Sequence, residues 1–190
     1  QAATILDQAL PARPPGFCIG CPERPVFSAL KLAQQEVGPV HVAADIGCHS
    51  FATFEPFSQG HSILGYGMSL ASRAGVSPVM QRRVLSIMGD GGFWHNGLLT
   101  GVASAVLNKN DGVLVVLANG YSSATGAQDI PSSAPAEGGR GRGVDIASAL
   151  RGMGVETIER VRTYDEVLNL RVGELAQQIG QVLREAHAPP

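Results

Sequence analysis

The stretch Val84-Leu85-Ser86-Ile87-Met88-Gly89-Asp90-Gly91 decides the fold of this chain. It is a short apolar run that ends in a Gly-Asp-Gly triplet. A second apolar run, residues 113–118, ends in Asn119, and residues 94–107 between the two runs have a helical pattern. The sequence therefore predicts a strand–helix–strand unit, whose parallel strands end at the edge of the sheet where ligands of open α/β folds bind.

Two side chains at these strand ends suit a hard cation. The carboxylate of Asp90 and the carboxamide of Asn119 offer oxygen ligands to an ion such as Mg²⁺, which also takes phosphate oxygens. Gly89 and Gly91 let backbone N–H groups come close to those phosphates. The alternative is an ordinary turn at Gly-Asp-Gly, but the downstream asparagine and the polar segment 121–128 favour cofactor binding.

Composition limits the classes of protein that fit. The chain has 190 residues, of which 44% are hydrophobic and 16% charged, which suffices for a single domain over residues 1–190. The net charge of −2 provides no basic face for nucleic acid, and no apolar run is long enough to span a membrane. Three cysteines, an odd number, argue against a disulfide framework and favour a reducing cytoplasm or a metal site. The first ten residues lack the pattern of a secretory signal, and a start at Gln1 is compatible with a piece of a longer protein.

Strand-like and helical patterns alternate along the chain, which predicts a three-layer α/β/α architecture with a mostly parallel sheet. A proline-rich extended segment, residues 1–24, comes first, and a Ser-, Pro- and Gly-rich stretch, residues 131–143, is expected to be a mobile loop. Besides the central unit, we expect strands at 40–46 and 156–161 and helices at 25–36, 63–74, 145–153 and 164–186.

The cysteines form a second pattern. Cys18 and Cys21 lie in Cys-Ile-Gly-Cys-Pro, and Cys48 ends Asp-Ile-Gly-Cys after the first strand. Such a pair occurs in redox loops and zinc sites, where His49 or His61 would supply a further ligand. The alternative is three unlinked thiols.

These motifs together resemble a known family. Gly-Asp-Gly with a downstream Asn resembles the thiamine-diphosphate signature. With the two cysteine motifs and Asn108-Lys109, the chain resembles the thiamine-binding part of 2-oxoacid:ferredoxin oxidoreductases, most of all indolepyruvate ferredoxin oxidoreductase, from about residue 14 to residue 128. The family often carries Asn-Asn where this chain has Ala118-Asn119. The resemblance implies the thiamine-diphosphate-binding (PP-type) α/β fold.

The resemblance also implies roles for individual residues. Asp90, Asn119 and the backbone carbonyl of Tyr121 would bind Mg²⁺. The cofactor-binding residues would be Gly47, Cys48, Gly65, Gly89, Asp90, Gly91, Gly92, Phe93, Asn119, Tyr121, Ser122, Ser123 and Thr125.

Three residues are candidates for catalysis. Leu64 would wedge between the two rings of the cofactor and bend it, although a core leucine is the alternative. His95 follows the diphosphate loop and would reach cofactor or substrate, although a surface histidine is equally compatible with its place. His49, beside Cys48, would face the same pocket.

In relatives, cysteines at the places of Cys18, Cys21 and Cys48 hold a [4Fe–4S] cluster with a fourth cysteine, which this chain lacks. Either a non-cysteine or partner-chain ligand completes the cluster, or the cluster is absent and the cysteines line the pocket; we favour its absence in this chain alone.

The resemblance implies oxidative decarboxylation of an arylpyruvate-type 2-oxoacid with coenzyme A, and electron transfer to ferredoxin in the cytoplasm. The activating glutamate would come from a pyrimidine-binding domain or subunit, so we expect a dimer or hetero-oligomer. The alternatives are a subunit of a non-oxidative thiamine-dependent decarboxylase or acetolactate-synthase-like enzyme, and a non-catalytic Rossmann-like module.

Overall fold

The structure is a computed structural model that describes residues 14–134, 143–162 and 172–185. Its strands are β1 (Val42–Ala44), β2 (Ser62–Ile63), β3 (Leu85–Gly89) and β4 (Val113–Leu117). Its helices are α2 (Glu23–Val37), η1 (Cys48–Thr53), α3 (Ser69–Val76), η2 (Ser77–Val79), α4 (Asp90–Gly92), η3 (Phe93–Val102), α5 (Ala103–Leu107), α6 (Ile146–Gly152) and α7 (Val172–Glu185). Among the described residues, no helix has the length and apolarity that crossing a membrane would require.

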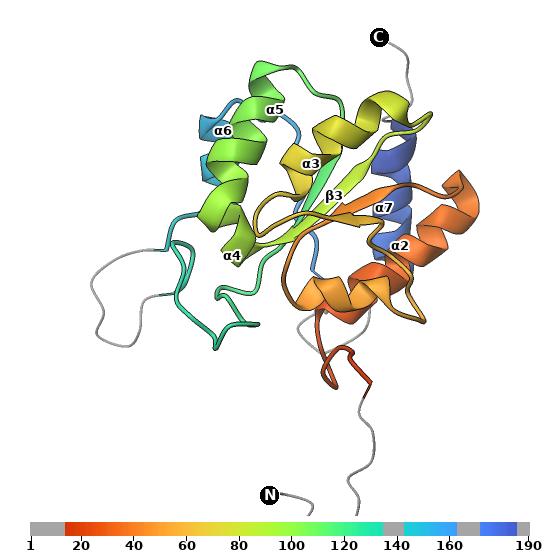
Figure 1. The fold of residues 1–190 in the computed structure, drawn as a ribbon, viewed down its shortest axis with the longest axis horizontal. Helices are drawn as coiled ribbons and strands as arrows, with labels where there is room; N and C mark the ends of the chain where they lie inside the picture. The colour runs from red at the N-terminus through yellow and green to blue at the C-terminus, as the bar shows by residue number, and fades with distance from the viewer. Residues whose placement is uncertain (1–13, 135–142, 163–171, 186–190) are drawn as a thin grey trace, which may run out of the picture.

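The four strands form a parallel sheet in the order β2-β1-β3-β4 (Figure 1). β3 lies in the interior and pairs with β4 along its whole length, from Leu85 opposite Val113 to Gly89 opposite Leu117. The residues that follow β3 and β4 therefore leave the sheet side by side. This register brings Asp90 next to Asn119.

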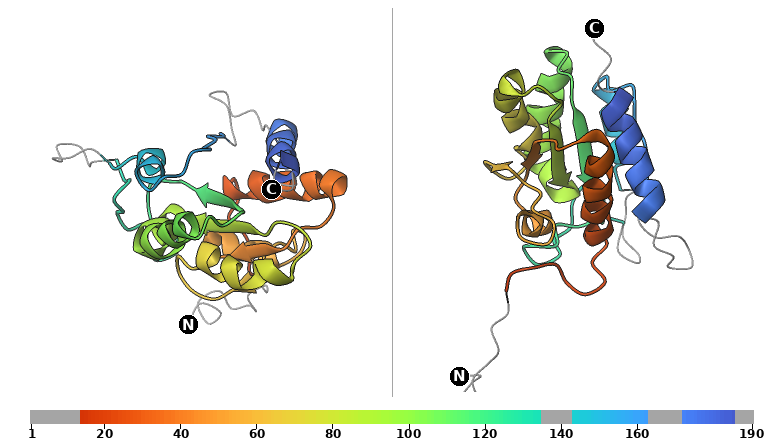
Figure 2. Two further views of the ribbon diagram at one scale, coloured as in Figure 1. Left: turned by 90° about the horizontal axis from the view of Figure 1, so that it is seen from above. Right: turned by 90° about the vertical axis from the view of Figure 1, so that its right-hand side faces the viewer.

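Helices cover both faces of the sheet, which makes three layers (Figure 2). Alternation along β3 explains the two faces, because successive side chains of a strand point to opposite sides. Leu85 and Ile87 contact the α2 side, together with Phe27 and Leu30 of that helix. Met88 contacts the opposite cluster, which includes Leu70, Phe93, Val102 and Leu150. α7 lies along α2 and closes the first face with Leu175 and Leu183.

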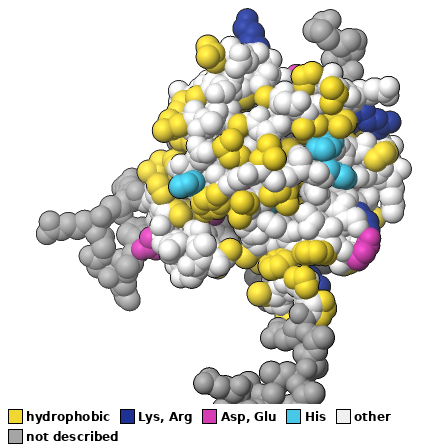
Figure 3. Space-filling view, viewed as in Figure 1, with side chains coloured by type: hydrophobic (Ala, Val, Ile, Leu, Met, Phe, Trp, Pro, Cys, Tyr) yellow, Lys and Arg dark blue, Asp and Glu magenta, His cyan; other side chains and the backbone are white. Residues whose placement is uncertain are grey.

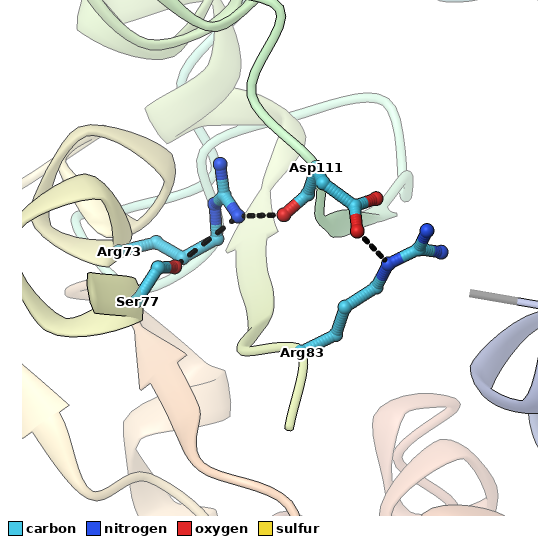
Figure 4. A network of polar contacts seen from close by, with 4 residues as sticks. All are labelled: Arg73, Ser77, Arg83 and Asp111. Carbon is cyan, nitrogen blue, oxygen red and sulfur yellow. Dashed lines mark hydrogen bonds and ion pairs between the residues drawn. The ribbon is translucent and has the colours of Figure 1, made fainter. Parts of the chain in front are cut away.

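A buried arginine fixes the start of β4 (Figure 4). The guanidinium of Arg73, in α3, donates to the backbone carbonyl of Asp111 and to the hydroxyl of Ser77, while Arg83 pairs with the Asp111 carboxylate at 2.5 Å. A Cβ atom at Gly112 would lie 2.2 Å from the Arg73 guanidinium. A side chain at residue 112 would therefore displace the Arg73 guanidinium from these contacts.

The predicted α/β/α architecture with a parallel sheet is confirmed, as is the central strand–helix–strand unit. The helix predicted at 25–36 is α2, which begins two residues earlier, so the last two residues of the predicted extended segment are helical. The connecting helix also begins earlier than predicted, at Asp90, and η3 within it is a π-helix.

Two element predictions were wrong. The helix predicted at 63–74 begins only at Ser69, because Ser62 and Ile63 pair with β1 and Gly67 adopts a φ of 77° that interrupts helical geometry. Residues 156–161 do not form a strand. Ile158 packs against the core cluster that Leu114 and Val116 of β4 also contact, while Arg160 pairs with Asp145 at the start of α6.

Three further predictions fall partly outside the described residues. Residues 1–13 of the predicted extended segment, residues 135–142 of the predicted mobile loop, and residues 164–171 and 186 of the predicted last helix are not described. The described part of that helix is α7, where Leu175 and Ile179 pack inward as the periodicity indicates.

Candidate cofactor-binding site

A pocket of about 150 Å³ opens at the carboxyl ends of β1, β3 and β4. This is the edge of a parallel sheet at which ligands bind in open α/β folds. Most of the lining was predicted from the sequence: Gly47, His49, Gly89, Asp90, Gly91, Gly92, Asn119, Tyr121, Ser122, Ser123 and Thr125. The lining also includes Glu23, Ile46, Tyr66, Leu117 and Ala124, which were not predicted as site residues.

Asp90 joins the ends of β3 and β4. One carboxylate oxygen, Oδ2, accepts hydrogen bonds from the backbone N–H groups of Asn119 (2.9 Å) and Gly120 (2.7 Å), and Oδ1 accepts one from Gly91 (3.0 Å). The side chain is buried, with the residue 2% exposed. Burial raises the pKa of Asp90, and the three N–H donors oppose that shift by stabilising the carboxylate.

Asn119 organises the segment that follows β4. Its Oδ1 accepts from the backbone N–H of Tyr121 at 3.2 Å, and its Nδ2 donates to the hydroxyl of Ser123 at 3.3 Å. Two backbone hydrogen bonds between Ser122 and Gln128 close the segment into a loop. The carboxamide and the Ser122 and Ser123 side chains are thereby held at the rim of the pocket.

Glycine is required in the loop after β3. A Cβ atom at Gly91 would lie 2.3 Å from the Tyr66 hydroxyl and 3.0 Å from the Ser122 hydroxyl. At Gly92 it would lie 2.1 Å from the carboxylate of Asp45, a fully buried residue. The absence of side chains at Gly91 and Gly92 thus lets these polar groups of Tyr66, Ser122 and Asp45 pack directly against the loop, which also lines the pocket.

His49 lies beneath the loop as a neutral imidazole. The residue is 3% exposed, and burial lowers its pKa to about 4. Its Nε2 is buried without a hydrogen-bond partner among the described residues. A Cβ atom at Gly47 would lie 2.6 Å from its ring, so the glycine of Asp-Ile-Gly-Cys makes room for this histidine.

Glu23, the first residue of α2, is the main lining residue that the motifs missed. It is 8% exposed, and its Oε2 is buried without a partner in the described part of the chain. Burial, and then the negative charge of Asp90, raise its pKa to about 7. The only sequence feature that could have indicated Glu23 as a site residue is its position directly after Cys21-Pro22. A glutamate in the first turn is, however, common in any helix.

Several predicted site residues lie outside this lining. Leu64 is 74% exposed, and His95 is exposed with its ring 5.0 Å from that of Tyr66. Phe93 is fully buried in the core, so only its backbone faces the loop, and Gly65 is half-buried beside Met68.

The three cysteines are free thiols, and none of them, including the predicted cofactor-binding residue Cys48, is among the residues that line the pocket. Cys48 lies 3.6 Å from the Ser123 hydroxyl, while Cys18 is exposed in the turn that leads to Cys21. Burial raises the pKa of the Cys21 thiol. No group of three or more His, Cys, Asp or Glu residues in the described ranges is arranged to hold a metal ion, so the structure offers no ready ligand set for a cluster.

Fold and pocket define a class of protein: a parallel α/β domain with a buried carboxylate and a carboxamide at adjacent strand ends, above a glycine-rich loop. Residues 45–185 match the family model described as thiamine pyrophosphate enzyme, C-terminal TPP binding domain, and the chain belongs to this family.

Curated relatives are similar over most of this chain. Indolepyruvate oxidoreductase subunit IorA of Methanothermobacter thermautotrophicus is 34% identical over 157 residues, and that of Archaeoglobus fulgidus is 33% identical over 156 residues. These alignments cover 80% and 82% of this chain but 25% of each relative. The chain thus spans about a quarter of the length of these relatives.

A solved structure has the same fold. It is 2-oxoglutarate:ferredoxin oxidoreductase from Magnetococcus marinus with 2-oxoglutarate, coenzyme A and succinyl-CoA bound. The TM-score is 0.68 at 19% sequence identity, over 92% of this chain and 61% of that chain.

Proposed function

We propose that the pocket binds the diphosphate of thiamine diphosphate together with Mg²⁺. Asp90, Asn119 and the backbone carbonyl of Tyr121 are the protein ligands of the ion. The observation that carries this proposal is the Asp90 carboxylate, buried at the pocket and tied to the backbone N–H groups of Asn119 and Gly120. An oxygen-rich ligand set next to the glycine loop that lines the pocket suits a magnesium-bound phosphate.

The other lining residues orient the cofactor. The hydroxyls of Ser122 and Ser123 are available as hydrogen-bond donors to phosphate oxygens, and the N–H groups at the start of α4 supply further donors. The Thr125 hydroxyl donates to Gln128 Oε1 in this structure and would have to change partner to bind a phosphate oxygen. His49, neutral at physiological pH, donates or accepts a hydrogen bond without adding charge. Thiamine diphosphate supplies a carbon nucleophile for the 2-oxoacid carbonyl and an electron sink for decarboxylation.

We further propose that the enzyme is a 2-oxoacid oxidoreductase that acts on an arylpyruvate-type substrate with coenzyme A and passes electrons to ferredoxin in the cytoplasm. The names of the curated relatives and the ligands of the solved neighbour support this class of reaction. Since the chain spans a quarter of those relatives, the rest of the machinery comes from other domains or subunits.

A pyrimidine-binding domain is one such part. It supplies the glutamate that activates the aminopyrimidine ring and packs over the open side of the pocket. Leu64 and His95, both exposed, then meet the cofactor only in the assembled enzyme, with Leu64 between the two rings and His95 near the reacting carbon.

Substituting Asp90→Asn tests the cation site. We expect thiamine diphosphate binding in the presence of Mg²⁺ to weaken at least about 10- to 100-fold, because the carboxylate ligand is lost. Calorimetric titration of the chain with its partner domain measures this. Asp129→Asn, an exposed aspartate on the following loop, is the matched control and should leave binding unchanged. Equal affinities of the Asp90 and Asp129 variants would refute the proposal.

A non-oxidative thiamine-dependent decarboxylase, or an acetolactate-synthase-like enzyme, is the second candidate. The matching family model is described only as that of thiamine pyrophosphate enzymes, and the chain holds three cysteines without a fourth. The assembled enzyme decides between the two. Aldehyde or acetolactate formation without an electron acceptor would favour this second candidate, while acceptor-dependent acyl-CoA formation would favour the first.

A further inference from the structure

Glu23 places a second carboxylate at the pocket that Asp90 lines. It begins α2, far from Asp90 in sequence, and the fold brings the two residues to the same cavity. More than nine-tenths of Glu23 is buried, yet its Oε2 makes no hydrogen bond with the described residues. Most buried polar atoms have partners, so an orphaned carboxylate oxygen calls for an explanation.

The pocket offers these carboxylates no cation of its own. Neither Lys nor Arg is among the described residues that line it. Two acidic groups that face one cavity repel each other, and the charge of Asp90 does act on Glu23. An incoming diphosphate would add to this repulsion. A divalent cation between these groups removes it.

We propose that Glu23 is the second carboxylate of the Mg²⁺ site, acting on the ion directly or through one of its bound waters. Mg²⁺ in proteins is typically held by one or two carboxylates together with substrate phosphates, and it keeps several waters. This inference rests on the proposed function, because it assumes that Mg²⁺ and thiamine diphosphate enter this pocket. It gives the orphaned Oε2 atom the partner that the described residues do not provide.

If Glu23 has this role, the substitution Glu23→Gln should have opposite effects on the stability of the chain, relative to the wild type, without and with Mg²⁺. In Glu23→Gln the buried negative charge is replaced by a neutral group of nearly the same shape. Without Mg²⁺, the variant chain should be at least as stable as the wild type, because repulsion from Asp90 is removed. With Mg²⁺ and thiamine diphosphate, the wild type should gain more stability than the variant.

The experiment uses the chain assembled with its pyrimidine-binding partner. Mg²⁺ is titrated at saturating thiamine diphosphate by calorimetry, and denaturant unfolding is followed for the chain with and without both ligands. We expect Glu23→Gln to weaken Mg²⁺ binding about 10- to 100-fold, the usual range for residues that support a metal site. Glu36→Gln, at the exposed far end of α2, is the matched control and should bind Mg²⁺ like the wild type.

A conservative variant separates the charge from the packing. Glu23→Asp keeps the carboxylate and should bind Mg²⁺ more tightly than Glu23→Gln, even if both variants lose some stability. The inference is overturned if Glu23→Gln and Glu36→Gln have the same Mg²⁺ affinity, or if Glu23→Asp is no better than Glu23→Gln. Failure of the wild type itself to bind thiamine diphosphate would instead refute the proposed function.

Discussion

His49 should make the stability of the chain depend on pH. Its pKa is about 4 in the folded chain and near the ordinary value of 6.5 when unfolded, so the unfolded state binds more protons between these values. The contribution of His49 is therefore complete above pH 6.5 and is lost as the pH falls through 6.5 towards 4. The loss approaches about 3 kcal/mol.

Denaturant unfolding at pH 7.5, 5.5 and 4.5 measures this loss, with His49→Asn as the comparison. The wild type should lose more stability on acidification than the variant does. Parallel pH profiles for the two proteins would mean that His49 is protonated as easily in the folded chain as in the unfolded one.

Among individual residues, the sequence predicted those site residues that lie within contiguous motifs. Asp90 and Asn119 were predicted because each directly follows an apolar strand, and the parallel register brings the two strand ends together. Glu23 could not be predicted, because its burial depends on where the first turn of α2 meets the end of β3. Phe93 shows the opposite case. It was predicted to bind the cofactor because it follows the loop, but its side chain is buried in the core.

The junction between the loop before α3 and the start of η3 depends on a close backbone contact. A Cβ atom at Gly67 would lie 2.5 Å from the Gly92 carbonyl oxygen, and the φ of 77° at Gly67 disfavours any other residue. Gly67→Ala should therefore cost about 2–4 kcal/mol of stability. Gly75→Ala, inside α3 with open space around it, should instead stabilise the chain by about 0.5–1 kcal/mol.

Denaturant unfolding of both variants checks the prediction. The opposite signs matter more than the magnitudes, because both variants make the same chemical change within one region of the chain. A Gly67→Ala variant as stable as the wild type would show that the loop and η3 can move apart without cost.

Among the elements, long apolar runs were predicted well and short or exposed pieces were not. β3 and β4 have five residues each and were found from their Val, Leu and Ile content. β2 has two residues, too few for a pattern, and the second of them, Ile63, was assigned to a helix. The segment 156–161 has the alternation of a strand, but the tertiary contacts of Ile158 and Arg160 determine its course.

The whole molecule exposes many large apolar side chains. Figure 3 shows hydrophobic side chains of all sizes spread over one face, where acidic and basic groups are sparse. Leu64 directly follows β2 and therefore lies at the carboxyl edge of the sheet, where the proposed partner domain packs. Leu107 ends α5, just before β4, at the opposite edge. Both are well exposed, at 74% and 82%.

Leu64→Glu should therefore weaken association with the pyrimidine-binding partner, because it places a charge in an apolar interface. We expect at least a tenfold loss, from roughly 1.4 kcal/mol or more, by analytical ultracentrifugation or calorimetry. Leu107→Glu should have no effect on assembly. Equal effects of the two substitutions would mean that the partner does not cover the carboxyl edge.

The carboxylate of Asp90 already joins two strand ends before any ion arrives. The cofactor-binding site is thus formed when the chain folds, and ligand binding is not needed to form it. Cofactor binding should therefore be a single-step association. Its observed rate constant should rise in proportion to ligand concentration, with no slower phase afterwards.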